Sequence, residues 1–481
     1  MKHYLTVDLG TGNTRVALVR SDGAILAIET FTNRYYRDAA YGDAQYFLPG
    51  EWAESILGCC ARLHRQFPDI RADAVSSAGA RQSIVLLDKD GRAYYGLPNI
   101  DNRGRDYMSL IENRDEIYAL SGKWVTEDFC AAKLMGLRLR RPELYSLLGT
   151  VLSISEWIAY IFTGVRAMEH SQACETQLYD LAARRWSERL CGCYGVDIGL
   201  LPPLMPAGSV VGRVLPEQVS AFGMADGAVF IMGGADTQTA LRQTGLGEGD
   251  IAVVSGTTSP VAALCREKYY DAQQRVWTDA NLGGESFIVE MNPGVTGLNY
   301  QRIKAGLCAD LSYEELEAAY AAKTDFSCTA SFSSLLFYER RSLKNGGFFM
   351  RSPLGSEPDR VDMAWAVLAD IACSIYEQLS RLMALTGCES RRVLCCGGGF
   401  RSAALCRMLS DLSGLELLLR PGFEQATIAG LVSLCNDRFG LRSGCDGAAA
   451  ATVCSPRRQQ LIHSYYPVWL ENRSRANRSD I

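Results

Sequence analysis

The sequence has no long apolar run. No segment approaches the roughly 18 uninterrupted apolar residues of a membrane-spanning helix. The first residues, M-K-H-Y-L-T-V-D, also lack the apolar stretch and the cleavage site of a signal peptide. We therefore expect no membrane partner and a cytoplasmic location.

Blocks of like charge are missing as well. The 49 Lys and Arg residues and the 54 Asp and Glu residues are interspersed, and the formal net charge is −5. This distribution gives no electrostatic reason to expect nucleic acid or an anionic membrane as a partner. A small molecule is the predicted partner.

The cysteines do not have the spacing of metal ligands. Among the 17 cysteines, Cys191 and Cys193 have neither a second pair nor a nearby histidine at zinc-ligand spacing. Others lie in apolar runs, where a free thiol packs as a small hydrophobe. These are Cys59, Cys60, Cys373, Cys395, Cys396 and Cys406. We expect reduced, structural cysteines and no metal cluster.

Length and periodicity predict an α/β protein of two domains around a central cleft. A chain of 481 residues exceeds the usual size of a single core. Strand patterns open the chain and helical and strand patterns then alternate. The Gly-rich segment at 245–250 is the predicted boundary, which gives domains 1–246 and 247–481. After about residue 455 the polar, Arg-rich tail predicts a peripheral helix or a frayed end.

The individual elements follow from local patterns. Strands are expected at 4–8, 14–20, 24–29, 83–87, 229–233, 251–254, 261–264, 392–396 and 415–419, and helices at 51–67, 363–385, 402–412 and 425–435. The strand, Gly-Thr turn and strand at 251–264 echo those at 6–18, which indicates two related domains.

Two Gly- and Thr-rich turns are candidate phosphate loops. In D-L-G-T-G-N-T-R, from Asp8 to Arg15, the glycines let backbone N–H groups approach an anion, and Asp8 suits water-mediated holding of Mg²⁺. S-G-T-T-S at 255–259 occupies the equivalent place in the second half. Two opposed turns could hold a polyphosphate from both sides. A Gly-rich hairpin without a ligand is the alternative for the first turn.

A third glycine cluster, G-G-G-F-R-S at 397–402, lies between a strand and a helix start, where small residues admit a flat ring or a phosphate. It is not a dinucleotide-binding fingerprint, because Ser402 stands where the last glycine is needed. A dehydrogenase is therefore disfavoured.

Asp236 in G-G-A-D-T-Q comes just after a predicted buried strand, where ligands of open α/β sheets bind. Phosphoryl transfer needs one carboxylate to accept the proton of the attacking hydroxyl. The alternative is that Asp236 only caps the helix expected at 237–244.

Taken in order, D-L-G-T-G-N-T-R, G-G-A-D-T-Q, G-D-I-A-V-V-S-G-T-T and C-G-G-G-F-R-S resemble the FGGY carbohydrate kinases, the family of glycerol kinase, xylulokinase and autoinducer-2 kinase. The resemblance covers about residues 4–435 and implies two actin-like (ribonuclease H-like) ATPase domains. It implies ATP and Mg²⁺ as cofactors and a small sugar, polyol or related open-chain carbohydrate as substrate. It leaves open whether the chain forms a homodimer.

The resemblance also implies roles for individual residues. Asp236 would be the catalytic base and, with Asp8, would place the metal. The substrate would lie against Arg81, Gln82, Asn99, Asp101 and Asp236 in the N-terminal domain. The nucleotide would be bound by Thr11, Gly12, Asn13, Arg15, Gly256, Thr257, Gly398, Gly399 and Ser402, the later ones in the C-terminal domain.

One departure from the family concerns the substrate. Glycerol kinases and autoinducer-2 kinases carry Arg-Glu where this chain has Arg81-Gln82, and xylulokinases carry Met-His. The amide keeps an acceptor and adds two donors, so the hydroxyl pattern read there should differ. Gln82→Glu is therefore expected to shift the preference among polyols and ketoses.

Three alternatives of function remain at this point. One is an autoinducer-2 (dihydroxypentanedione) kinase of the same family. The second is a catalytically silent sugar-binding regulator, which the presence of Asp8, Asp236 and Thr257 disfavours. The third is an actin- or Hsp70-like ATPase, which would not need Arg81, Asp101 and Arg103 beside a substrate pocket.

Thr257→Val and Gly256→Ala are expected to weaken nucleotide binding more than sugar binding, because both change the phosphate loop of the second domain. Isothermal titration with each ligand separates the two effects. Loss of sugar affinity alone would contradict the domain assignment.

Overall fold

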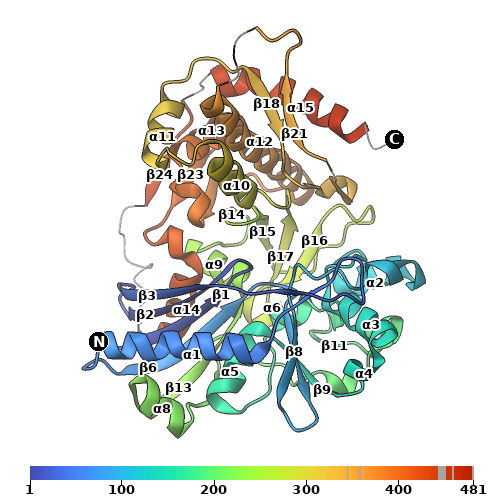
Figure 1. Ribbon diagram of the computed structural model, residues 1–481, viewed down its shortest axis with the longest axis vertical. Coiled ribbons are helices and arrows are strands. Elements are labelled where there is room, and N and C mark those ends of the chain that lie inside the picture. The colour runs from blue at the N-terminus through green and yellow to red at the C-terminus, as the bar shows by residue number, and fades with distance from the viewer. Residues whose placement is uncertain (344, 356, 358, 442–450, 458–459, 479–481) are drawn as a thin grey trace. The chain divides into compact units, whose positions relative to one another are not determined.

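The computed structural model describes residues 1–343, 345–355, 357, 359–441, 451–457 and 460–478, and its contacts divide the chain into two compact units. Unit 1 consists of Met1–Gln243, Cys265–Ile288 and the described part of Ala426–Ala448. Unit 2 consists of Thr244–Leu264, Val289–Gln425 and the described part of Ala449–Ile481. The α/β class predicted from the sequence is confirmed (Figure 1).

The units are not the two contiguous segments that were predicted. The first crossing, after Gln243, lies close to the predicted boundary, but two later segments return to unit 1. The Thr278 N–H donates to the carbonyl of Gly122 at 2.9 Å. The Tyr4 hydroxyl donates to Asn436 Oδ1 at 2.8 Å. Such contacts join residues that are far apart in sequence, so local composition does not reveal them.

Unit 1 is built on a six-stranded sheet with the order β12-β13-β6-β1-β2-β3. Its strands are β1 (His3–Leu9), β2 (Asn13–Arg20), β3 (Ile25–Thr32), β6 (Ala72–Gly79), β12 (Val210–Arg213) and β13 (Met224–Ala235). The predicted opening meander is confirmed, because β2 pairs antiparallel with both β1 and β3. In contrast, β1, β6 and β13 run parallel to one another.

Helices cover both faces of this sheet. Leu5 and Val7 of β1 belong to a core cluster with Trp52 of α1 (Pro49–Gln66) and with residues of α5 (Ile154–Thr163). Tyr4 points to the opposite face, where it packs in a cluster with Leu431 of α14 (Ala426–Arg438). This alternation is the two-residue period of a strand buried on both sides. The ribbon shows α1 alongside β2 and β3 (Figure 1).

The remaining elements of unit 1 surround the sheet. The strands are β4 (Tyr36–Arg37), β5 (Gln45–Tyr46), β7 (Ile84–Asp88), β8 (Ala93–Leu97), β9 (Leu148–Ser153), β10 (Tyr179–Asp180), β11 (Arg185–Trp186) and β16 (Trp277–Ala280). The helices are α2 (Arg114–Ser121), α3 (Cys130–Arg140), α4 (Pro142–Tyr145), α6 (His170–Cys174), α7 (Glu188–Tyr194), α8 (Pro216–Phe222) and α9 (Asp236–Thr244).

Unit 2 repeats the parallel core. Strand β14 (Ile251–Val254) pairs antiparallel with β15 (Val261–Cys265) and parallel with β22 (Arg392–Cys396). Strand β23 (Glu416–Leu419) continues the parallel run, and β24 (Thr452–Cys454) closes it antiparallel. The other elements are α10 (Gly297–Leu307), α11 (Tyr313–Ala321), α12 (Arg360–Thr386), α13 (Ala403–Ser413), β18 (Cys328–Ser331), β19 (Leu335–Leu336), β20 (Arg341–Ser342) and β21 (Gly347–Met350). The chain passes from unit 1 to unit 2 within β17 (Phe287–Met291).

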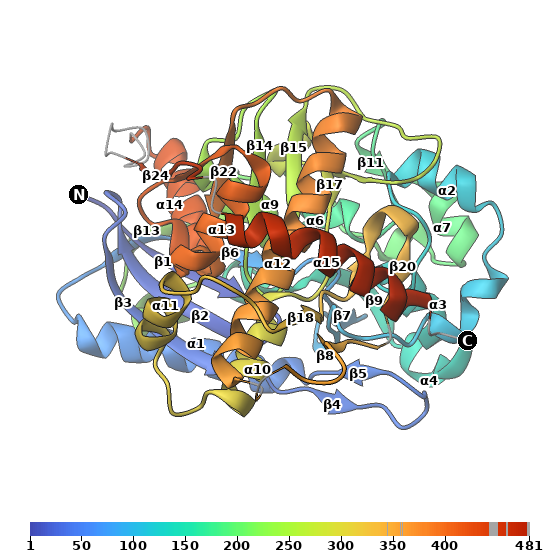
Figure 2. The ribbon, with the colours of Figure 1, turned by 90° about the horizontal axis from the view of Figure 1, so that it is seen from above.

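The C-terminal tail forms helix α15 (Gln460–Arg478), so the helix of the two expectations for this segment is found and the frayed end is not; α15 is packed into unit 2. Tyr465 and Trp469 are fully buried, and the Trp469 indole N–H donates to Asp370 Oδ1 at 2.8 Å. Figure 2 shows α15 lying across α12 and β18. The buried Ile462, Tyr465 and Trp469 recur at helical spacing within this polar segment.

Within the described part of the chain, no helix combines the length and the apolar character needed to span a membrane. The described cysteines are free thiols, and the six that were predicted to pack as hydrophobes are buried.

Gly430→Ala is expected to destabilise unit 1, because a Cβ at Gly430 would lie 1.9 Å from the carbonyl oxygen of Thr239 in α9. Overpacking of this kind costs about 1–3 kcal/mol or more. Thermal unfolding should give a lower Tm for this variant. Gly192→Ala in α7 is the control, because a Cβ there meets nothing within 4 Å and should stabilise the helix. Equal Tm values for the two variants would contradict the packing of α14 on α9.

Candidate active site

Three parallel strands of unit 1 end at the same level. In the register of the sheet, Leu9 of β1 pairs with Gly79 of β6, and Gly79 pairs with Ala235 of β13. Because the strands run parallel, the segments that follow them leave from one edge of the sheet. These segments carry the first candidate phosphate loop, which begins at Gly10, the pair Arg81-Gln82, and Asp236.

The first loop is exposed at its tip and held firmly at its base. Thr11, Gly12 and Asn13 are at least partly exposed. Asn33 is buried and ties the loop together: its Nδ2 donates to the carbonyl of Gly10 at 2.7 Å, and its own N–H donates to the carbonyl of Gly12 at 3.0 Å. Nothing in the sequence around Asn33 indicated this role.

Asp8, at the end of β1, is 2% exposed and forms an ion pair with Arg15 of β2. The antiparallel register brings these two residues opposite each other. The pair places one predicted metal-holding carboxylate and one predicted phosphate-binding guanidinium together beside the loop.

Asp236 begins helix α9 and is partly buried. Its Oδ1 accepts a hydrogen bond from the Thr237 N–H at 2.7 Å, while no described hydrogen bond engages Oδ2. Burial raises the pKa of Asp236 to about 6, with Arg81 lowering it and Asp8 raising it.

A chain of buried hydrogen bonds, which was not predicted from the sequence, supports the backbone before Asp236. The Ala235 N–H donates to Ser171 Oγ at 3.0 Å, and Ser171 in turn hydrogen-bonds through its hydroxyl to Glu169. Glu169 Oε1 accepts from the Gly283 N–H at 2.7 Å. Burial raises the pKa of Glu169 to about 7. Its side chain has no exposed surface.

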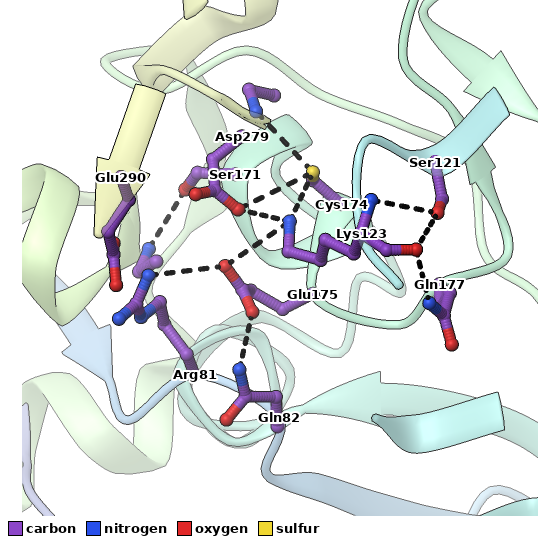
Figure 3. A network of polar contacts seen from close by, with 12 residues as sticks. Arg81, Gln82, Ser121, Lys123, Ser171, Cys174, Glu175, Gln177, Asp279 and Glu290 are labelled. Atoms are coloured by element: carbon purple, nitrogen blue, oxygen red, sulfur yellow. Dashed lines mark hydrogen bonds and ion pairs between the residues drawn. The ribbon is translucent and has the colours of Figure 1, made fainter. Parts of the chain in front are cut away.

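Arg81 and Gln82 turn sharply at the end of β6. Gln82 has a φ of 61°, in the left-handed region. Its Nε2 donates to Glu175 Oε2 at 2.8 Å, and Arg81 Nη1 lies 3.7 Å from Glu175 Oε1 (Figure 3). The fully buried Lys133 donates to the carbonyls of Gln82 and Pro98, both at 2.8 Å. Lys133 lies within an apolar run of α3, and this position in the sequence could have indicated that the lysine is buried and paired.

The other two predicted substrate residues differ in accessibility. Asn99 is partly buried, and its Nδ2 donates to Thr11 Oγ1 at 2.8 Å, which joins it to the phosphate loop. Asp101 has no exposed surface: Arg103 Nε donates to its Oδ2 at 2.6 Å, and the Gln45 N–H donates to Oδ1 at 3.0 Å. Burial raises the pKa of Asp101, against the lowering effect of Arg103. In this structure Asp101 is engaged by Arg103 and by the Gln45 N–H. A direct contact between Asp101 and the substrate stays a prediction.

The second candidate phosphate loop lies at the corresponding edge of unit 2. Val254 of β14 pairs with Cys396 of β22 in parallel, so Ser255 and Gly397 leave the sheet side by side. Gly397 has a φ of +98°, and a Cβ there would lie 2.3 Å from the carbonyl oxygen of Ser255. Only glycine allows this close approach.

Beyond this contact the two loops are open. Gly256, Thr257 and Gly398 are exposed, and a Cβ at Gly256 or Gly398 would meet nothing within 4 Å. The Thr296 N–H, at the start of α10, donates to the carbonyl of Thr257 at 3.0 Å and was not anticipated. Ser402 caps α13 by accepting from the Leu405 N–H, and it donates to Glu317 at 2.5 Å, while its contact with nucleotide stays a prediction.

Comparison with known proteins decides the family. A model described as the N-terminal domain of the FGGY family of carbohydrate kinases matches residues 3–242. YoaC of Bacillus subtilis (strain 168), whose name assigns it to the sugar kinases, is 37% identical, and the alignment covers 97% of this chain and 96% of YoaC. The chain belongs to the FGGY family of carbohydrate kinases.

More distant similarities of this FGGY kinase agree. The autoinducer-2 kinase of Enterobacter sp. (strain 638) is 25% identical over 94% of this chain and 88% of its own. The structure of a Plasmodium falciparum glycerol kinase with ADP superposes with a TM-score of 0.84 at 16% identity, covering 99% of this chain and 98% of that one. The likeness shows the two-domain, actin-like fold, and family membership makes this chain an ATP-dependent sugar kinase.

Asp236→Asn should raise the Tm of this kinase above neutral pH. The unfolded chain ionises Asp near pH 4, whereas the folded state holds its proton up to about pH 6. Folding therefore loses stability as pH rises through this window, and above it the buried charge destabilises the wild type. The uncharged amide avoids this loss, so the Tm difference should grow from pH 4 to pH 7.

Asp22→Asn is the control for this comparison, because Arg20 lowers the pKa of the exposed Asp22. Its Tm should stay the same or fall slightly above pH 4. A Tm of Asp236→Asn below that of the wild type at pH 7.5 would contradict the raised pKa of Asp236.

Proposed function

We propose that this kinase transfers the γ-phosphoryl group of ATP to a hydroxyl of a small, neutral polyol or open-chain sugar, with Asp236 as general base. The observation that carries the proposal is the shared edge of β1, β6 and β13, which gathers Asp8, Arg81-Gln82 and Asp236. Unit 1 would bind the acceptor, and unit 2 would bind the nucleotide through the 255–259 and 397–399 loops.

The environment of Asp236 supports the role of a base. A pKa of about 6 leaves the carboxylate ionised at pH 7 while making it more basic than an exposed aspartate. General bases work best when their pKa lies near the working pH. The nearby Arg81 keeps the carboxylate ionised, and the Thr237 N–H fixes Oδ1. The other oxygen, Oδ2, would accept the proton of the substrate hydroxyl.

The residues at this edge fit a magnesium ion that arrives with the nucleotide. Asp8 and Asp236 are carboxylates, the ligand type that Mg²⁺ prefers, and Mg²⁺ commonly keeps several waters and one or two carboxylates beside phosphate oxygens. Among the described residues no cluster of three or more His, Cys, Asp or Glu could hold a metal by itself. When bound with ATP, the ion would neutralise charge on the phosphates.

Autoinducer-2 phosphorylation is a second candidate within the same chemistry. The observation in its favour is the 25% identity to an autoinducer-2 kinase over most of both chains. The identity is too low to transfer a substrate, so dihydroxypentanedione belongs among the compounds to be tested.

ADP production should be measured with ATP, Mg²⁺ and each of glycerol, D-xylulose, D-sorbitol, D-gluconate and dihydroxypentanedione. At least one hydroxyl compound should raise ADP release well above the rate without acceptor. With that compound, Asp236→Asn should lower kcat by roughly two to four orders of magnitude. The kcat/KM of the wild type should rise about tenfold per pH unit up to about pH 6 and then level off.

Asp22→Asn serves again as the matched control and should leave kcat unchanged, because Asp22 lies in the exposed turn between β2 and β3. The role of Asp236 as base would be wrong if Asp236→Asn kept more than a tenth of the wild-type kcat. ATP turnover that no hydroxyl compound stimulates would count against the proposed acceptor.

A further inference from the structure

Glu175 connects the two residues that were predicted to read the substrate. Its side chain has no exposed surface. Oε2 accepts from Gln82 Nε2 at 2.8 Å, and Oε1 lies 3.7 Å from both Arg81 Nη1 and Lys123 Nζ. Figure 3 shows Glu175 between Gln82 on one side and the buried Lys123 on the other.

The charge of Glu175 is held by a fully buried network. Lys123 has no exposed surface and forms an ion pair with Asp279, and its Nζ lies 3.0 Å from Cys174 Sγ. Burial lowers the pKa of Lys123, but Asp279, Cys174 and Glu175 raise it more, so the net shift is upward. The cations Lys123 and Arg81 lie on either side of Glu175, and a carboxylate paired with them accepts hydrogen bonds and donates none.

This fixes the orientation of the Gln82 amide. Because a carboxylate only accepts, the NH₂ group of Gln82 must face Glu175 and the carbonyl Oε1 must face away. No described residue donates a hydrogen bond to Oε1. The backbone cannot readily readjust, since Lys133 holds the Gln82 carbonyl at 2.8 Å and the left-handed φ of 61° is restrictive.

Asn99 repeats the arrangement. Its Nδ2 is used by Thr11 Oγ1 at 2.8 Å, while its Oδ1 is buried without a hydrogen-bond partner in the described chain. A buried carbonyl left unpaired costs about 1–3 kcal/mol. Each amide side chain therefore uses an N–H donor within the protein and leaves its carbonyl oxygen as an acceptor.

We propose that Glu175 is a specificity-determining positioning residue, which holds Gln82 so that its carbonyl oxygen accepts a hydrogen bond from a second hydroxyl of the substrate. The inference rests on the proposed function and narrows it. A polyol hydroxyl donates to Gln82 Oε1, whereas a carboxylate at that place would set oxygen against oxygen. The substrate is thus a neutral polyhydroxyl compound and not a sugar acid.

The hydrogen bond between Gln82 and Glu175 also changes the expected effect of the Gln82→Glu substitution. The sequence alone led us to expect a shift of preference among polyols and ketoses. In the structure, the new carboxylate would face that of Glu175 at about the distance of the present hydrogen bond, 2.8 Å. Two carboxylates this close cannot both ionise without a large cost, so the variant should take up a proton or displace the side chain.

A double-mutant cycle tests the pair. Gln82→Glu and Glu175→Gln should each lower kcat/KM for the best polyol by about tenfold or more, mainly through KM. The double variant restores one carboxylate and one amide with the hydrogen bond reversed, so it should recover at least about tenfold over the product of the two single losses. Gln66→Glu, at the exposed end of α1, is the control for added charge and should behave like the wild type.

The Tm of the same variants gives a readout that needs no substrate. Gln82→Glu should lose more Tm at pH 8 than at pH 5, because the lower pH supplies the shared proton, and the double variant should not show this dependence. The role of Glu175 would be overturned if the kcat/KM losses of the two single variants simply multiplied in the double variant. It would also be overturned if Gln82→Glu behaved like the wild type in both assays.

The matched pair D-sorbitol and D-gluconate tests the substrate class. Sorbitol carries a hydroxymethyl group where gluconate carries a carboxylate, and the wild type should favour sorbitol in kcat/KM by at least about tenfold. A preference for gluconate would overturn the inference while leaving the proposed kinase function intact. If neither these two nor any other hydroxyl compound is phosphorylated, the proposed function fails, and the Tm cycle alone then decides whether Glu175 and Gln82 are paired.

Discussion

The site depends on one geometric constraint, the parallel alignment of β1, β6 and β13 with their carboxyl ends level. The pairing of Leu9, Gly79 and Ala235 in adjacent strands means that three segments distant in sequence leave the sheet together. A parallel sheet requires long crossover connections. In this chain those crossovers carry α1, the peripheral strands and the helices up to α8. The grouping of these segments at one edge is therefore a consequence of the topology. Unit 2 has the same arrangement, with β14 parallel to β22.

Behind this edge lies a layer of buried ionic and polar side chains. Lys123, Lys133, Glu175 and Asp279 are all fully buried. Burying charge is costly even when the charges are paired, and a well-packed apolar cluster is often as stable. Here the buried charges fix the orientation of Gln82. Lys133 donates to its backbone carbonyl, and Glu175 accepts from its side-chain amide. A cluster of apolar side chains would leave that amide free to rotate. Ser171 and Glu169 fix the chain before Asp236 in the same way.

Much of the candidate site could be predicted because its residues lie in short, local patterns. The loops at 8–15 and 255–259 and the segment 233–238 each combine a strand end with a glycine turn, which is a property of contiguous sequence. The prediction failed where a local pattern was weak or a partner was remote. The burial of α15 was not predicted, because the Trp469 indole contacts Asp370, which lies 99 positions earlier in the chain.

The sequence by itself determined the α/β class, the opening meander, the family resemblance and the identity of the candidate base, because strand periodicity, glycine turns and motif order are written along the chain. Only the tertiary structure decided that 265–288 and 426–441 belong to unit 1, that Asp101 is enclosed by Arg103, and that Glu175 pairs with Gln82. The physical reason is the same in each case. Residues such as Gln82 and Glu175 are 93 positions apart, and hydrogen bonds and burial act through space, which the order of residues does not record.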